Sequence, residues 1–168
     1  GMALHWPERT KAKGEIRSQF HHVIDVAPTV LEAAKLPQPR SVNGVRQRPM
    51  DGVSMLYSLD RATAPDRRTT QYFEMFGNRG IYHKGWVACT RHSTPWVMTA
   101  LPPLTSDVWE LYHVDKDFSQ ANDLARQHPA NLKELQEVFV KEAVRNHVLP
   151  IDDRRSERFS PSIAGRPD

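Results

Sequence analysis

Few residues in this chain have the type and spacing that enzymatic chemistry requires. The only cysteine, Cys89, lies in an apolar run, where we expect a small buried thiol that packs rather than reacts. His21 and His22 are adjacent, but no third ligand follows nearby, so we expect one ring to be buried and hydrogen-bonded, the other exposed, and neither to bind a metal. Serine, histidine and aspartate all occur, yet no G-x-S-x-G sequence presents a serine as a nucleophile.

Composition limits the classes of partner. The 168 residues suffice for a domain with a real core, and the formal net charge is only +3. The basic residues are scattered among acidic ones, which is typical of a solvated surface and not of a nucleic-acid interface. The basic pairs are Arg46/Arg48, Arg67/Arg68 and Arg154/Arg155. We expect no membrane-spanning helix, because no apolar run approaches about 18 residues. We see no signal peptide, and the compartment stays open between cytoplasm and periplasm.

The N-terminal part predicts one strand and one helix. Residues 2–6 form an apolar run ended by proline, which is typical of a strand in a buried sheet. Asp25, followed by Pro28 in a first turn, predicts a helix behind an acidic cap that ends before Pro37. Residues 37–68 contain many prolines and glycines and predict an irregular connection, interrupted by a short turn at 54–59.

The following part predicts a sheet and a covering helix. Strands are expected at 69–75, 79–83 and 86–91, the last two joined by a tight turn at Lys84-Gly85, and a further strand around Trp109. Apolar residues at helical spacing predict a helix over 132–144, opened by Pro129. The fold class is therefore α+β: an antiparallel sheet of three to four strands packed by a C-terminal amphipathic helix, preceded by a strand-helix remnant of an α/β core.

These elements suggest four segments along the chain. They are a strand and helix at 2–36, an irregular connection at 37–68, a sheet-and-helix subdomain at 69–149, and an extended tail at 150–168. The first segment would bury its apolar faces against neighbours that we do not find in this chain. Because exposed apolar patches drive association, we expect a homodimer or association with another chain.

Three sequence patterns resemble the sulfatase family. Residues 25–34, Asp-Val-Ala-Pro-Thr-Val-Leu-Glu-Ala-Ala, resemble its D-h-x-P-T-h-L-x-x-A-G helix, with Lys35 in place of the glycine. Residues 50–56 are similar to its h-D-G-x-S-L turn. Residues 110–125 resemble the C-terminal signature ELY-x-x-x-x-D-x-x-E-x-x-N-L-A, with Gln120 in place of the second acid. Residues 70–79 are most similar to bacterial arylsulfatases.

This resemblance implies a chemistry whose machinery we do not find here. Sulfatases hydrolyse sulfate esters with a formylglycine, made from cysteine or serine in a C/S-x-P-x-R motif, and with a divalent cation, usually calcium. Cys89 does not match that motif. The paired metal aspartates of the family lie near its N-terminus, whereas Asp152-Asp153 lies in the C-terminal tail, so we assign it no metal role. We therefore expect no catalytic residue, no metal site and no cofactor in this chain, with calcium only in a full-length relative.

The resemblance also implies where substrate would approach. In the family the smaller C-terminal subdomain helps to shape the substrate cleft, so loops around five polar residues would form its rim. Arginine and histidine there would bind an anionic ester by charge-assisted hydrogen bonds. The alternative interpretation is that these residues belong to the ordinary surface at strand ends. The candidates are Asn78, Arg79, His83, Arg91 and His92.

The prediction is a C-terminal part of an arylsulfatase-like sulfuric ester hydrolase that is inactive alone. One alternative is a stand-alone module that binds anions or a protein partner without turnover. Another is the non-catalytic half of a split sulfatase, whose partner is a catalytic sulfatase half.

Overall fold

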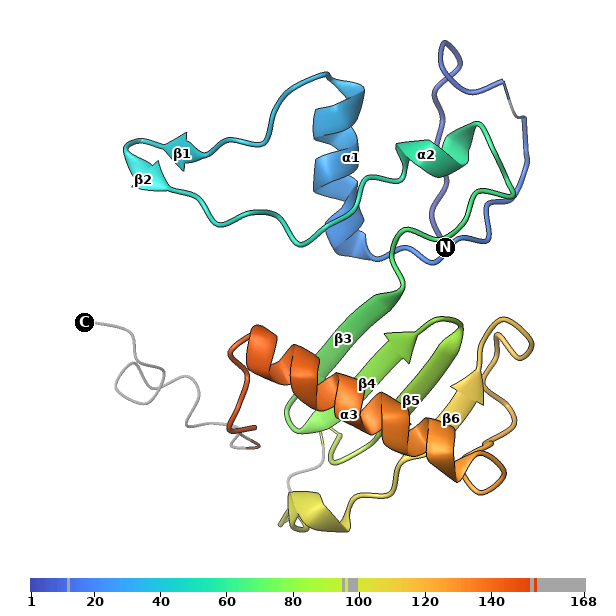
Figure 1. Cartoon of the computed structure of the whole chain (residues 1–168), viewed down its shortest axis with the longest axis vertical. Helices are drawn as coiled ribbons and strands as arrows, with labels where there is room; N and C mark the ends of the chain where they lie inside the picture. The colour runs from blue at the N-terminus through green and yellow to red at the C-terminus, as the bar shows by residue number, and fades with distance from the viewer. Residues whose placement is uncertain (12, 95, 97–99, 152, 154–168) are drawn as a thin grey trace. The chain divides into compact units, whose positions relative to one another are not determined.

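The computed structural model describes residues 1–11, 13–94, 96, 100–151 and 153. It divides into two compact units, Gly1–Thr69 and Thr70–Asp168, each of which is considered by itself (Figure 1). The elements of unit 1 are η1 (Val23–Asp25), α1 (Val26–Ala33), β1 (Ser41–Val42), β2 (Val45–Arg46) and α2 (Leu56–Leu59). Those of unit 2 are β3 (Thr70–Met75), β4 (Asn78–His83), β5 (Trp86–Thr90), η2 (Leu104–Ser106), β6 (Glu110–His113) and α3 (Pro129–Arg145).

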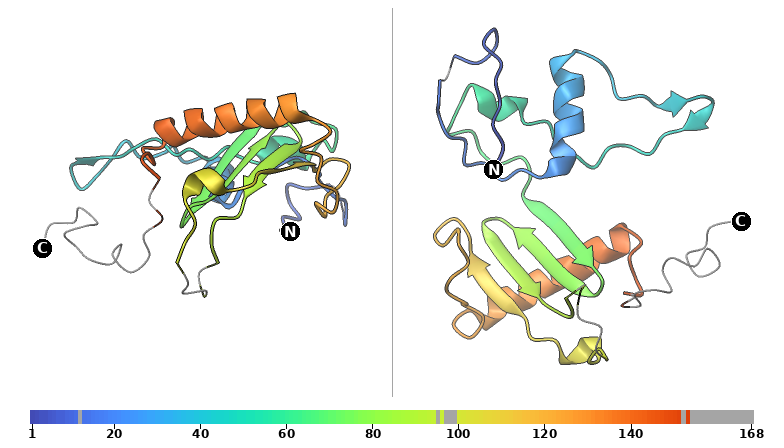
Figure 2. Two further views of the ribbon diagram at one scale, coloured as in Figure 1. Left: turned by 90° about the horizontal axis from the view of Figure 1, so that it is seen from below. Right: turned by 180° about the vertical axis from the view of Figure 1, so that it is seen from behind.

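Unit 2 has the predicted α+β architecture. Its four strands form an antiparallel sheet in the order β3-β4-β5-β6, and α3 lies across one face of that sheet (Figure 2). The expected sheet and its C-terminal helix are confirmed. In the described part of the chain, no helix has both the length and the apolar character needed to cross a bilayer.

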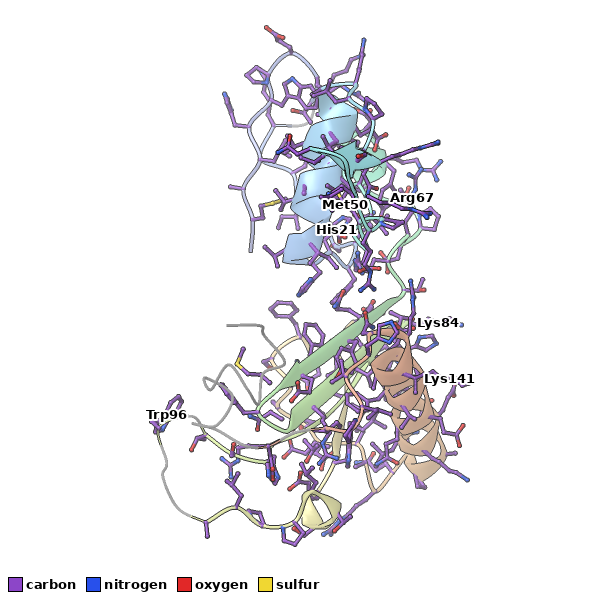
Figure 3. The ribbon with its side chains drawn as sticks, turned by 90° about the vertical axis from the view of Figure 1, so that its left-hand side faces the viewer. His21, Met50, Arg67, Lys84, Trp96 and Lys141 are labelled. Atoms are coloured by element: carbon purple, nitrogen blue, oxygen red, sulfur yellow. The ribbon has the colours of Figure 1, made fainter. Side chains whose placement is uncertain are left out.

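The core of unit 2 forms where the middle of the sheet meets α3. Ile81, Ala88 and Leu111 stand in register on neighbouring strands, and none of them is exposed. Phe139 of α3 packs on this row and stacks on Tyr72, with ring centroids 5.0 Å apart. The helical spacing of the apolar residues in α3 therefore buries the face that the sequence predicted, while charged residues such as Lys141 lie on its outer side (Figure 3).

The turn between β4 and β5 depends on glycine. Lys84 and Gly85 have positive φ angles of 48° and 82°, as in the two-residue turns whose twist matches that of a hairpin. A Cβ on Gly85 would lie 2.2 Å from Oδ2 of Asp115. The residue at this turn must therefore adopt a left-handed conformation and also leave room for the loop after β6.

Residues 2–6 correct one prediction, because they form no strand. The carbonyl oxygen of Trp6 accepts hydrogen bonds from the backbone N–H groups of Arg9 and Thr10, at 3.1 and 2.9 Å. The chain turns there instead of extending. A strand needs a neighbour to pair its backbone groups, and none pairs with residues 2–6 in the described part of unit 1.

The segment 37–68 is less irregular than predicted. Two short strands, β1 and β2, pair with Ser41 opposite Arg46 and Val42 opposite Val45. This hairpin stands away from α1 at the end of an extended loop (Figure 1). The predicted turn at 54–59 contains the short helix α2.

Gly52 marks a close approach of two backbone segments, and Gly52→Ala is expected to destabilise unit 1 by about 2 kcal/mol or more. A Cβ there would lie 2.1 Å from the carbonyl oxygen of Ile24, so the backbone must move apart. The matched control is Gly80→Ala, whose Cβ would meet its nearest atom at 3.6 Å. Urea unfolding, monitored by hydrogen exchange at the amides of unit 1, measures the loss of stability. Equal effects of the two substitutions would contradict this explanation.

Candidate functional site

The carboxylate of Asp25 is the central group of unit 1. Its side chain is completely buried and is paired with Arg68, whose Nε lies 2.9 and 3.0 Å from the two carboxylate oxygens. The backbone N–H groups of Val53 and His22 also donate to it, at 2.7 and 2.9 Å. Arg68 in turn donates to the carbonyl oxygen of Asp51 at 3.0 Å. One carboxylate thus joins three segments that are distant in sequence.

Thr29 makes a second link between the same segments. Its hydroxyl donates to the carbonyl oxygen of Asp25 at 2.6 Å and accepts from the backbone N–H of Met55 at 2.9 Å. The first two sulfatase-like patterns, at 25–34 and 50–56, are therefore docked on each other. In this chain the aspartate of the first pattern pairs with an arginine, and its threonine hydrogen-bonds to the backbone. The glycine of the second pattern allows the two segments to approach closely.

Asp25 and Arg68 correct two predictions. Asp25 does occupy the N-cap position of α1, but its side chain makes no cap hydrogen bond there, because the carboxylate is turned to Arg68. Arg68, counted with the solvated basic residues, has only 7% of its surface exposed. Burial by itself would raise the pKa of Asp25, but the hydrogen bonds from Arg68, Val53 and His22 outweigh burial and lower the pKa below its ordinary value.

The paired histidines also differ from the prediction, because both rings are half-buried. The ring of His21 meets Tyr57 edge to face at a centroid distance of 5.8 Å, and its Nδ1 lies 3.8 Å from Asp25 Oδ2. Burial lowers the pKa of His21. The short helix η1 begins directly after His22, which is its N-cap residue.

The third pattern, at 110–125, is likewise structural. Oδ1 of Asp123 accepts hydrogen bonds from the backbone N–H groups of Leu111 and Ala125, at 3.0 and 2.9 Å. Asp117 accepts from the N–H of Asn122 at 2.8 Å. These two carboxylates close the loop after β6 and return the chain to the sheet edge before α3.

One end of the sheet in unit 2 holds a group of ionisable side chains, most of which are buried. We define the His92 cluster as Arg79, His92, Asp107 and Asp153. The His92 side chain is not exposed at all, and its Nδ1 lies 3.0 Å from both carboxylate oxygens of Asp107. Its Nε2 lies 3.2 Å from Asp153 Oδ2. Arg79 completes the cluster with an ion pair to Asp107.

The rest of this end of the sheet is tied to the same cluster. Asn78 accepts hydrogen bonds from the backbone N–H groups of His92 and Ser93, at 2.9 and 3.1 Å. Arg79 also donates to the carbonyl oxygen of Leu104 at 3.2 Å and lies over the ring of Trp109, 5.4 Å from its centroid. The cluster therefore holds the loops after β5 and before β6 against the start of β4.

The geometry of the His92 cluster fits a structural role better than nucleophilic catalysis. In a serine hydrolase the second imidazole nitrogen faces a serine hydroxyl, whereas here Asp153 faces it. Ser93 hydrogen-bonds instead to the carbonyl oxygen of Phe76, at 3.4 Å. Ser93 also begins the sequence Ser-Thr-Pro-Trp-Val, which has the serine and proline of the C/S-x-P-x-R motif but valine in place of its arginine.

The five predicted rim residues do not form one surface. Asn78, Arg79 and His92 meet at one end of β4 and have partners there, as described above. His83 lies at the other end of β4, with its Nδ1 2.8 Å from the hydroxyl of Thr70, and burial lowers its pKa. Arg91 directly follows β5, at the end of the sheet where Asn78, Arg79 and His92 meet, and it is exposed. No carboxylate lies within ion-pair distance of Arg91 in the described part of the chain.

Cys89 is half-buried on β5. Burial, with Glu110 and Asp123 nearby, raises the pKa of its thiol to about 11, which disfavours the reactive thiolate. Among the residues that the structure describes, no three histidine, cysteine or acidic side chains are grouped as a metal site would require.

Three members of the buried charge networks were not recognised as such from the sequence. Arg68 follows another arginine, and Asp107 stands in a loop without a recognisable pattern. Asp153 was considered only as half of an acidic pair; its partner in that pair, Asp152, lies outside the described residues. No local signal distinguishes these three residues, because their partners are 15 to 61 positions away along the chain.

Comparison with known proteins finds the fold of this chain inside longer chains. No family model matches the sequence. The structure of Ps i-CgsB is 18% identical over 97% of this chain and 33% of its own, with a TM-score of 0.61. The structure of BT4656 in complex with its substrate D-glucosamine-2-N,6-O-disulfate is 16% identical over 78% of this chain and 25% of its own, with a TM-score of 0.52.

A third structure, BT33336S-sulf from Bacteroides thetaiotaomicron, is 18% identical over 70% of this chain and 24% of its own, but its TM-score of 0.45 carries no weight here. At these identities the similarity shows a shared fold. The chain spans a quarter to a third of the length of the structures that it matches.

Proposed function

We propose that this chain is the C-terminal part of a sulfatase-type, arylsulfatase-like sulfuric ester hydrolase and that it does not hydrolyse sulfate esters by itself. The observation that carries the proposal is the match of 78% of this chain to one quarter of BT4656, which was determined in complex with a disulfated glucosamine. The three sulfatase-like patterns support it, because they occur in the family's order. That BT4656 was determined with a disulfated glucosamine as its substrate favours sulfated sugars beside aryl sulfates as substrates of the whole enzyme.

The role that we assign to this part is to build and hold one side of the substrate cleft. Asn78, Arg79 and His92 keep the loops at the end of the sheet in place, since their polar groups are engaged within the protein. Arg91 is the exposed cation beside them, and it is the best placed of the five candidates to attract an anionic ester.

Hydrolysis assays test the proposal directly. The purified chain, with calcium added, is incubated with a chromogenic aryl sulfate and with D-glucosamine-2-N,6-O-disulfate, against buffer and against a mock purification from cells without the chain. We expect no turnover above either blank, because the chain has no C/S-x-P-x-R nucleophile motif. Turnover that copurifies with the chain would overturn the non-catalytic assignment.

A titration with the same disulfated sugar separates the alternative of an anion-binding module. Saturable binding that weakens with salt and is reduced by Arg91→Gln, without turnover, would favour a stand-alone binding module over an inert part of an enzyme. Lys133→Gln, an exposed change on α3, is the matched control for loss of one positive charge.

A further inference from the structure

The turn of the projecting β1–β2 hairpin is formed by Asn43 and Gly44 (Figure 1). Both have positive φ angles, 50° and 81°, as in the two-residue turns for which asparagine followed by glycine is a preferred pair. The same pair brings two reactive groups next to each other. The backbone nitrogen of Gly44 can attack the side-chain amide carbon of Asn43, and glycine has no side chain to hinder that approach.

The surroundings of Asn43 leave this attack unobstructed. Asn43 and Gly44 are exposed, and so are both residues of β1 and both of β2. A Cβ on Gly44 would meet nothing within 4 Å. The side-chain amides of Asn78, Asn122 and Asn146 donate hydrogen bonds to Met75, Asp117 and Glu142, whereas in the described part of the chain no such bond holds the amide of Asn43.

The attack requires Asn43 to rotate out of its turn conformation, so it depends on how easily the hairpin opens. The two strands pair only Ser41 with Arg46 and Val42 with Val45. An isolated two-stranded hairpin is marginally stable in water, and exposed segments with few contacts open at little cost in free energy. We therefore expect the hairpin to open often, without unfolding of the rest of unit 1.

The charges around the turn favour the reaction. The attacking form of the Gly44 nitrogen has lost its proton and is therefore negative. Residues 40–48 include three arginines and no acidic residue, so positive charges surround the developing anion and stabilise it. The three arginines are Arg40, Arg46 and Arg48.

We propose that Asn43 is a site of spontaneous deamidation, with water as the co-reactant. In the first step, a bond forms between the Gly44 nitrogen and Cγ of Asn43, and the bond from Cγ to the amide nitrogen breaks. Ammonia leaves with the proton of Gly44, and a succinimide ring remains. Water then opens the ring and returns a proton to the Gly44 nitrogen. Cleavage at Cγ gives aspartate, whereas cleavage at the backbone carbonyl carbon gives isoaspartate.

Either product changes the hairpin. A new carboxylate lowers the formal net charge by one and lies among arginines. In isoaspartate the chain runs through the former side chain, which lengthens the backbone and shifts the pairing of Val42 with Val45. The chemistry is independent of the proposed function, because it needs only the hairpin and water.

The junction of Asp51 and Gly52 provides an internal comparison. Aspartate before glycine can close the same ring with loss of water, but here the backbone is held. A Cβ on Gly52 would lie 2.1 Å from the carbonyl oxygen of Ile24, and the carbonyl oxygen of Asp51 accepts a hydrogen bond from Arg68 at 3.0 Å. Rotation at Asp51 would separate the two docked segments of unit 1, so folding should protect this junction.

The test measures both junctions in the full chain, folded and unfolded in urea, after incubation at mildly alkaline pH. Trypsin at mildly acidic pH then releases peptides 41–46 and 47–61 separately, since Arg48 precedes a proline and is not cleaved. Mass spectrometry detects the conversion of an amide to a carboxyl in 41–46, and electron-transfer fragmentation distinguishes isoaspartate from aspartate. We expect folding to slow Asp51 roughly tenfold or more beyond its effect on Asn43.

Two results would overturn the proposal. One is that peptide 41–46 stays unmodified in the folded chain, which would show that the turn holds Asn43. The other is that folding slows the two junctions equally, because local opening of the hairpin would then not control the reaction.

A substitution confirms which residue reacts. Asn43→Gln keeps the amide but requires a larger ring, so the acidic species that accumulate in the whole chain should fall by roughly tenfold. The matched control is Asn131→Gln on α3, which should leave their accumulation unchanged. If the acidic species persist in Asn43→Gln, another asparagine is the site and the proposal is wrong.

Discussion

Asp25→Asn is expected to destabilise unit 1 by about 3–5 kcal/mol, enough to unfold it, because it leaves Arg68 buried without its counter-ion. The carboxylate also accepts from the N–H groups of Val53 and His22, so α1 and the segment at 50–56 lose their common anchor. Hydrogen exchange at the amides of Val53 and Met55, both bonded to the Asp25–Thr29 segment, reports the loss directly.

The control for Asp25→Asn is Glu32→Gln, an exposed change on the same helix, which should alter stability by less than about 0.5 kcal/mol. Arg68→Met combined with Asp25→Leu should restore part of the lost stability, since a buried pair can be replaced by apolar residues of similar volume. If Asp25→Asn behaves like Glu32→Gln, the ion pair is not the anchor of unit 1.

The same carboxylate determines an acid response. The pKa of Asp25 is lower in the folded protein than its ordinary value of about 3.9. A lowered pKa contributes stability above the unfolded pKa, and that contribution is lost as the pH falls through the folded pKa. Protection of the Val53 amide, relative to its intrinsic exchange rate, should therefore fall below about pH 4, and this step should be absent when the pair is replaced by Asp25→Leu with Arg68→Met.

Asp107→Asn is the second large effect, with an expected loss of about 3 kcal/mol in unit 2. Asp107 is 3% exposed and faces both Arg79 and His92. Without its charge, Arg79 stays nearly buried beside Trp109 with no counter-ion. Urea unfolding, monitored by tryptophan fluorescence, measures the loss of stability. The emission of Trp109 should also change in the folded protein, because Arg79 lies over its ring.

Glu137→Gln on the exposed face of α3 is the matched control for Asp107→Asn and should have little effect. Asp153→Asn separates the two sides of His92. Since the Asp153 side chain is 37% exposed, its loss should cost less than that of Asp107. An equal or larger loss from Asp153→Asn would contradict the assignment of Asp107 as the centre of the cluster.

The sequence predicted unit 2 well because its signals are local. A run rich in Thr, Tyr and Phe marked β3, the Lys84-Gly85 turn marked the hairpin of β4 and β5, the segment around Trp109 marked β6, and apolar spacing marked α3. The Asn43-Gly44 dipeptide is an equally strong hairpin signal and would have predicted β1 and β2. It was missed because the flanking strands are only two residues long and fully exposed.

The strand expected at 2–6 failed for the opposite reason. Apolar composition shows that a segment can join a sheet, but only a neighbouring strand makes it one. The same holds for the predicted rim residues. Residue type identified Arg79 and His92 as ionisable side chains, but only the fold showed that Asp107 lies between them.

The sequence by itself determined the α+β class, the approximate positions of the strands in unit 2, the hairpin at Lys84-Gly85, the amphipathic face of α3, and the likeness of three segments to sulfatases. The structural features follow from residue types and spacing along a few turns or strands, and the likeness follows from a resemblance of short motifs. Tertiary structure decided that Asp25 pairs with Arg68 and that His92 lies between Asp107 and Asp153. These depend on groups brought together from distant positions, because a buried charge is stable only where the fold supplies its partner.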